Sequence, residues 1–131
     1  MNEASILVKL EHENLIDFLG YCNDGTKMYL LYNFAPNATL ARLIFDTTCN
    51  LLDWNKRCNI ILGVGRALVY LQNHAPILII HCDVTPRNIL LDGSFEPKLS
   101  GFWAAMAMED RTDGIKALRV SGTMQVLNNS R

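Results

Sequence analysis

The longest periodic segment of the sequence begins at Asp53 and runs to about Asn73, and it constrains the fold more than any other feature. Asp53 is a good helix N-cap residue, because its side-chain oxygen can accept a hydrogen bond from a backbone N–H of the first turn. The segment therefore predicts one long helix that ends before Pro76. Its apolar residues recur at helical spacing on one stripe: Cys58, Ile61, Gly65, Leu68 and Leu71, widened by Ile60, Val64, Ala67 and Tyr70.

Two glycines lie inside this predicted helix. Gly63 and Gly65 each cost up to ~1 kcal/mol relative to alanine, because glycine loses more backbone freedom when a helix forms. Glycines at such positions indicate that a neighbouring backbone approaches the helix closely. We expect a close approach at both positions.

The other predicted elements are short and follow no regular alternation of strand and helix. Asp24-Gly25 indicates a tight hairpin turn, and Asp92-Gly93 indicates a second one, with Asp92 starting the turn and not binding a metal. The elements together predict an α+β fold. They comprise the C-terminal turns of a helix in 3–10, a hairpin of 15–21 and 27–34, a helix in 39–45, a buried strand in 77–80 and a hairpin of 89–91 and 98–100.

Composition excludes several classes of protein. A chain of 131 residues is enough for one domain, and 50% hydrophobic with 19% charged residues excludes intrinsic disorder. Twelve Lys plus Arg against 13 Asp plus Glu leave no basic surplus, so we expect no nucleic-acid or anionic-membrane partner. No apolar run approaches the ~20 residues of a spanning helix, and no secretory signal starts the chain. We therefore expect a soluble, cytoplasmic chain whose four cysteines, without a Cys-x-x-Cys pair, are reduced.

A polar loop, His81–Asn88, directly follows the apolar strand, and function is often carried by such loops. Adjacent His81, Cys82 and Asp83 rarely converge on one metal ion, and adjacency does not place an imidazole to activate a thiol. The spacing His-x-Asp-x-x-x-x-Asn instead matches a phosphoryl-transfer loop. In such a loop the Asp accepts the substrate's hydroxyl proton and the Asn holds magnesium.

At this loop the sequence resembles a protein kinase, because His81–Leu91 reads His-Cys-Asp-Val-Thr-Pro-Arg-Asn-Ile-Leu-Leu. The resemblance is to plant receptor-like kinases, especially the cysteine-rich group, and it covers about residues 2–123. Further segments share it: Asn14–Cys22, Leu30–Asn37, Leu52–Trp54 and Tyr70-Leu71. It implies an incomplete protein-kinase-like fold, with 1–35 as a small-lobe remnant, 36–123 as part of the large lobe and 124–131 as a divergent tail.

The resemblance assigns expected roles to individual residues, with ATP and Mg²⁺ as the implied cofactors. Asp83 falls at the proton-acceptor position, Asn88 at a metal position, and Glu3 at the position of the ion-pairing glutamate. The expected nucleotide contacts are Tyr32, Asn33, Ala35 and Leu90. Four residues match a stacked internal spine: Leu7, Phe18, His81 and Phe102.

Departures from the family pattern predict that the site is inactive. Thr85 stands where the family has a lysine that steadies the γ-phosphate, and Cys82 replaces an arginine. Gly101-Phe102-Trp103 replaces Asp-Phe-Gly, so the main magnesium ligand is lost. Losing one preorganised electrostatic contact to the transition state typically costs ~3–4 kcal/mol, or 100- to 1,000-fold in rate.

The sequence thus favours a truncated, catalytically inactive kinase homologue. The family's glycine-rich loop and its strand lysine would precede Glu3, and Met124–Leu127 departs from the expected end of the activation segment. One edge of the strand 28–34 would then lack its usual partner. Three alternatives stay open: a Ser/Thr kinase with weak activity, a binding module for another kinase or receptor, and a poorly folded product of a degraded gene copy.

Overall fold

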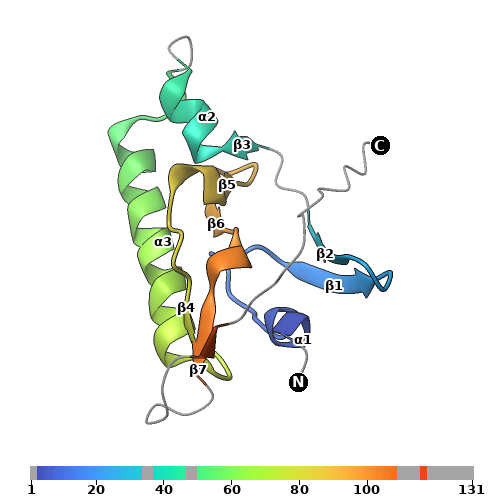
Figure 1. Cartoon of the computed structure of the whole chain (residues 1–131). Coiled ribbons are helices and arrows are strands. Elements are labelled where there is room, and N and C mark those ends of the chain that lie inside the picture. The colour runs from blue at the N-terminus through green and yellow to red at the C-terminus, as the bar shows by residue number, and fades with distance from the viewer. Residues whose placement is uncertain (1–2, 34–36, 47–49, 109–115, 118–131) are drawn as a thin grey trace.

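The computed structural model describes residues 3–33, 37–46, 50–108 and 116–117, and these form a mixed arrangement of helices and short strands (Figure 1). This arrangement confirms the predicted α+β class and is consistent with part of a kinase fold. The helices are α1 (Glu3–Leu7), α2 (Leu40–Phe45) and α3 (Trp54–Asn73). The strands are β1 (Phe18–Asn23), β2 (Met28–Tyr32), β3 (Asn37–Thr39), β4 (Leu78–Ile80), β5 (Ile89–Leu91), β6 (Pro97–Leu99), β7 (Met106–Met108) and β8 (Lys116–Ala117).

The long helix α3 begins where the sequence predicts. The Asp53 side chain accepts a hydrogen bond from the Lys56 N–H at 2.8 Å, which satisfies one of the free donors of the first turn. The helix packs against β4 and β6, and lies along one side of the molecule (Figure 1). The residues that it buries are Ile60, Gly63, Val64, Ala67 and Leu71.

The predicted stripe on α3 is largely wrong, because most of its members face outward. Ile61 is 69% exposed, Gly65 and Leu68 are also exposed, and Cys58 is half-buried. Of the stripe proper, Leu71 alone is buried, whereas Ile60, Val64 and Ala67, which were expected only to widen it, form the core face. Both faces of α3 are apolar, so periodicity alone could not identify the side that is covered.

The two helix glycines differ in their surroundings. A Cβ at Gly63 would overlap the ring of Pro97 in β6 and lie 2.9 Å from Asn14 Nδ2, so another segment does approach closely there, although with side-chain atoms and not with the predicted backbone. A Cβ at Gly65 would meet nothing within 4 Å. For the described part of the chain, the prediction of close approach is therefore wrong at Gly65.

Three small sheets are present in the described residues: β1–β2, β3–β5–β6 and β4–β7–β8, all with antiparallel neighbours. The first hairpin turns at Asp24-Gly25, as predicted. Asp24 Oδ1 accepts hydrogen bonds from the N–H of Lys27 and from both the hydroxyl and the N–H of Thr26. These bonds, led by that from Lys27, lower the pKa of Asp24 to about 2. Within the described part of the chain β2 pairs only with β1.

The second hairpin, β5–β6, is also confirmed, and Asp92 starts its turn by accepting hydrogen bonds from the N–H groups of Ser94 and Glu96. Four details differ from prediction. The first helix ends at Leu7, β1 begins only at Phe18, and Ile80 in β4 is 39% exposed. Strands β3, β7 and β8 were not predicted, because two or three residues hold no periodicity. Strands β3 and β7 also pair with strands that are distant in sequence.

A buried polar residue ties the segment before β1 to the large helix. Asn14 is fully buried, and its Nδ2 donates to Glu96 Oε1 at 2.7 Å and to the Pro97 carbonyl at 3.1 Å. Its Oδ1 accepts from Arg66 Nε at 3.2 Å. Because a buried amide without partners is costly, this network fixes how α3 and β6 meet the N-terminal segment.

Candidate functional site

The candidate site is a loop between β4 and β5, and it is built around the buried imidazole of His81. Nε2 of His81 lies 2.7 Å from the carbonyl oxygen of Ser100, and Nδ1 accepts the Asp83 N–H at 3.1 Å. These partners assign the proton to Nε2 and keep the ring neutral. Burial lowers the pKa of His81, although the bond to Ser100 and the charge of Asp83 oppose this shift.

The loop turns sharply between His81 and Asp83. Cys82 has φ 68°, a left-handed conformation that costs a non-glycine residue roughly 1–2 kcal/mol. This turn carries the Asp83 N–H back to His81, which offsets the backbone strain with a hydrogen bond. The Cys82 thiol is exposed, and it has no charged group with which to replace the family's arginine.

Asp83 and Asn88 are directly paired across the loop. Asn88 is buried, and its Nδ2 donates to the Asp83 backbone oxygen at 2.8 Å and to Asp83 Oδ2 at 2.9 Å. The Asn88 carbonyl accepts from both the N–H and the hydroxyl of Ser100. The structure thus brings the predicted proton acceptor and the predicted metal amide together and holds them against the strand that leads to Gly101.

Gly101 follows this strand with φ +78°, a conformation that L side chains rarely adopt. A Cβ built on Gly101 would overlap the side-chain amide of Asn88. The space in which a carboxylate would start is therefore already filled. Mg²⁺ needs near-octahedral oxygen coordination, and the residues present do not fit such a site. Among residues 3–33, 37–46, 50–108 and 116–117, no cluster of three His, Cys, Asp or Glu could hold a metal ion.

Thr85 sits on the same loop, just before the 3-10 turn Pro86–Asn88. Its hydroxyl oxygen is buried and has no hydrogen-bond partner in the described part of the chain. A neutral hydroxyl cannot supply the positive charge that the family's lysine brings to a phosphate. Thr85 therefore offers no substitute for that lysine.

Aromatic rings pack against one another beside the loop. Phe102 is almost fully buried. The centroid of its ring lies 4.8 Å from that of His81 and 5.5 Å from that of Phe18 in β1, and both contacts are edge-on. Leu7 of α1 belongs to the same buried core. The structure thus brings together three of the four predicted spine residues and buries the fourth in the same core; their role as a kinase spine stays a prediction.

The predicted nucleotide contacts are only partly described. Tyr32 ends β2 and is half-buried, and burial raises the pKa of its phenol. Asn33 donates its backbone N–H to the Asp17 carbonyl at 2.9 Å, and Leu90 lies half-buried in β5. Ala35 lies outside the described residues, as does the side chain of Glu3 at the start of α1. The adenine-binding role of these residues stays a prediction.

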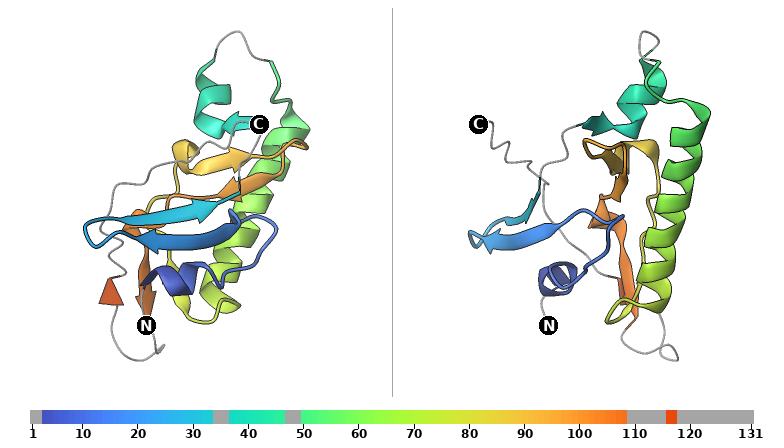
Figure 2. Two further views of the ribbon diagram at one scale, coloured as in Figure 1. Left: turned by 90° about the vertical axis from the view of Figure 1, so that its right-hand side faces the viewer. Right: turned by 180° about the vertical axis from the view of Figure 1, so that it is seen from behind.

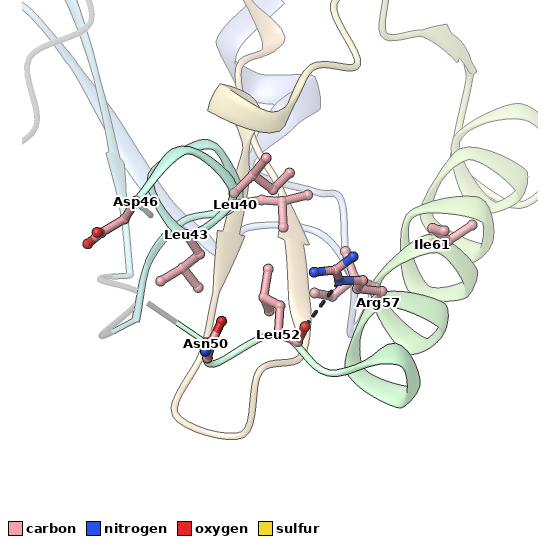
Figure 3. A pocket seen from close by; sticks show the side chains of 9 residues that line it. Leu40, Leu43, Asp46, Asn50, Leu52, Arg57 and Ile61 are labelled. Atoms are coloured by element: carbon pink, nitrogen blue, oxygen red, sulfur yellow. Dashed lines mark hydrogen bonds between the residues drawn. The ribbon is translucent and has the colours of Figure 1, made fainter. Parts of the chain in front are cut away.

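A cavity of about 490 Å³ lies between α2 and α3, and none of the predicted site residues lines it (Figure 3). Leu40, Leu43 and Leu52 form apolar walls, while Arg57 donates to the Leu52 carbonyl at 3.1 Å. The chemistry of the candidate site therefore rests on the His81–Asn88 loop and Gly101, and not on this cavity.

Sequence reasoning missed two residues that support the site. The Ser100 carbonyl accepts the His81 N–H and its hydroxyl holds the Asn88 carbonyl, while Asn14 holds α3 against β6. Ser100 had one available signal, since it directly precedes Gly101 at the end of a predicted strand. For Asn14 the sequence offered no signal beyond its place in the segment that resembles receptor-like kinases, because its hydrogen-bond partners are more than fifty residues away.

Comparison with known proteins identifies the family of this chain. The family described as protein kinase domain matches residues 1–126. A G-type lectin S-receptor-like serine/threonine-protein kinase from Arabidopsis thaliana is 43% identical over 123 residues, covering 93% of this chain and 14% of that protein. A putative cysteine-rich receptor-like protein kinase, number 33, from the same plant is 43% identical over 125 residues, covering 93% of this chain and 19% of that protein.

This chain therefore belongs to the protein kinase family, and it is similar to plant receptor-like kinases of both the lectin and the cysteine-rich types. The chain spans less than a fifth of the length of these relatives. The family generally uses ATP and Mg²⁺. In the described part of the chain no helix is long and apolar enough to cross a membrane.

Proposed function

We propose that this chain is a catalytically inactive member of the protein kinase family, which does not transfer phosphate from ATP to protein hydroxyls. The observation that carries the proposal is the contact at Gly101. That residue has no side-chain oxygen, and the Asn88 amide fills the space that a carboxylate would enter. The family's main magnesium ligand is thus absent, and a side chain at this position would require the Asn88 amide to move.

The charges around the loop support the same conclusion. Phosphoryl transfer depends almost entirely on positioning and on electrostatic stabilisation of the phosphates. Thr85 is neutral, and the Asn88 amide donates to Asp83. Losing one such contact costs ~3–4 kcal/mol. The effects of several losses need not add, because such residues act as a unit. One or two losses suffice to reduce turnover from ~1–100 per second to near background.

A second candidate is a Ser/Thr kinase with weak residual activity. It is favoured by Asp83, whose carboxylate is partly exposed at the loop and oriented by Asn88. Proton removal is a small part of a loose phosphoryl transfer, so this carboxylate alone supports little rate. A role as a binding module for another kinase or receptor is a third candidate, favoured by exposed apolar residues of α3 such as Ile61.

Incorporation of radiolabelled phosphate into a generic protein substrate separates these candidates. We expect the chain to incorporate no more label than its matched control, Asp83→Asn, which keeps the size of the side chain and removes its charge. Incorporation that is specific to the chain and lost in Asp83→Asn would contradict inactivity and favour the second candidate.

The division of the chain is also a proposal. We place the lobe boundary near residue 35, between β2 and β3, although residues 34–36 and the tail 124–131 lie outside the described residues. We also propose a cytoplasmic location, because the kinase domains of receptor-like kinases are intracellular. We propose no nucleic-acid partner, because the chain has no basic surplus.

A further inference from the structure

We infer that the turn His81–Asp83 is a pH-sensitive element of the fold, which opens when the buried imidazole of His81 takes up a second proton. The turn follows β4 and begins the loop that leads to β5. Both strands lie on the side of α3 that faces the rest of the described chain (Figures 1 and 2). Opening of the turn does not depend on whether the chain transfers phosphate.

Both nitrogens of the His81 ring have hydrogen-bond partners, and they share a single proton. Nε2 donates to the Ser100 carbonyl oxygen at 2.7 Å, while Nδ1 accepts the N–H of Asp83 at 3.1 Å. A charged imidazole is a donor at both nitrogens. A proton on Nδ1 would face the N–H of Asp83, which is also a donor, so this hydrogen bond has to break when the ring is charged.

Burial keeps the ring neutral at neutral pH. His81 is 2% exposed, and the Phe102 ring packs edge-on against it with the centroids 4.8 Å apart. A charge in such a place is costly, because it is removed from water. Burial accordingly lowers the pKa of His81. We therefore expect the turn to be closed at neutral pH and to open as the solution becomes acidic.

In the described part of the chain, the charged group that acts on the ring is the carboxylate of Asp83. Its charge favours the protonated ring, as does the hydrogen bond to Ser100, but burial has the larger effect on the pKa of His81. The groups that face the ring from the segment after β6, the Ser100 carbonyl and the Phe102 ring, do not titrate. Phe18 of β1, which packs on Phe102, does not titrate either. Proton uptake by His81 is therefore governed by its burial and by Asp83.

The backbone of the turn favours opening once the bond to His81 is lost. Cys82 has φ 68°, a left-handed conformation that residues with a Cβ disfavour. The hydrogen bond from the Asp83 N–H to His81 is the contact that offsets this strain in the closed turn. Strained residues persist only where their surroundings hold them in place. Loss of the bond therefore lets the backbone at Cys82 relax.

Opening also changes the pair of residues that follows the turn. Asn88 Nδ2 donates to the backbone oxygen of Asp83 at 2.8 Å and to its Oδ2 at 2.9 Å. Asn88 is buried, and its carbonyl accepts from the Ser100 hydroxyl, so it is held independently of Asp83. When the turn relaxes, Asp83 shifts relative to Asn88. A proton on His81 thus weakens the pairing of Asp83 with Asn88.

The direction of the pH dependence follows from the lowered pKa of His81. In the unfolded chain the ring has the ordinary pKa of about 6.5, whereas in the folded chain its pKa is lower. The contribution of His81 to stability is therefore fully present above pH 6.5 and is lost as the pH falls toward the folded pKa. Between about pH 7.5 and about pH 5.5, this residue should raise the equilibrium constant of unfolding by about 3- to 10-fold.

Nuclear magnetic resonance of the full chain from about pH 7.5 to about pH 4.5 tests the inference directly. The nitrogen chemical shifts of the His81 ring report its tautomer and charge, and we expect its titration midpoint below 6.5. Across this titration the hydrogen-exchange protection of the Asp83 amide should fall at least ~10-fold. The control is the Ile16 amide, which donates to the Leu99 carbonyl at 3.0 Å in the core and should keep its protection.

Two variants separate His81 from the other titrating groups. His81→Asn places an amide oxygen near the position of Nδ1 and does not titrate, so the rise of about 3- to 10-fold should vanish. His74→Asn makes the same change at an exposed histidine after α3 and should keep the rise. Urea unfolding compares each variant at about pH 5.5 with the same variant at about pH 7.5. The resonance measurements need no variant, so they decide the question even if His81→Asn does not fold.

Three results would overturn the inference. They are a His81 ring that titrates at or above 6.5, an Asp83 amide whose protection does not follow the ring, or a His81→Asn chain that keeps the full pH dependence. None of these measurements contains nucleotide, so each result is distinct from failure of the proposed inactivity.

Discussion

Gly101 joins β6 to the 3-10 turn Phe102–Ala104 at φ +78°, with the Asn88 amide against it. Gly25 is a matched control, because it has φ +89° but nothing within 4 Å of a built Cβ. We expect alanine at either position to lower the free energy of unfolding by ~1–2 kcal/mol through backbone strain. Gly101→Ala should cost about 1–3 kcal/mol more, because Asn88 must move. Urea unfolding measures both values; equal losses would contradict the contact.

Among the helical elements, α3 offers a similar matched pair. Gly63→Ala should destabilise the chain by about 1–3 kcal/mol, since its methyl group meets the Pro97 ring and Asn14. Gly65→Ala should stabilise the chain by up to ~1 kcal/mol, because its methyl group enters open space and alanine favours helix. Urea unfolding measures both changes in the free energy of unfolding. The same sign for both substitutions would contradict the packing of α3 on β6.

How far the elements could be predicted depended on where their stabilising contacts lie. The N-cap of α3 and the turn at Asp24 depend on side chains within three residues, so sequence alone predicted both. Strands β3 and β7 pair with residues far along the chain, and no local pattern identified them. The covered face of α3 was predicted wrongly, because both of its faces are apolar. Ile60, which is buried, and Ile61, which is exposed, cannot be told apart from the sequence.

For the molecule as a whole, the spacing of Asp83 and Asn88 predicted the loop, and the structure pairs them at 2.9 Å. What sequence could not show is that Asn88 fills the space at Gly101, since this depends on the backbone angle there and on how β5 and β6 are paired. The loss of the carboxylate could be read from one position. The contact between Gly101 and the Asn88 amide could be seen only in the folded structure.

The central claim is that the His81–Asn88 loop and Gly101 do not bind a magnesium–nucleotide complex in the way an active kinase does. Thermal unfolding of the full chain with saturating ATP, in Mg²⁺ and in EDTA, tests it most directly. We predict the same melting temperature in both. Stabilisation by ATP that requires Mg²⁺, of the ~2.7 kcal/mol expected at one hundred times the dissociation constant, and that is lost in Asn88→Ala, would contradict the account.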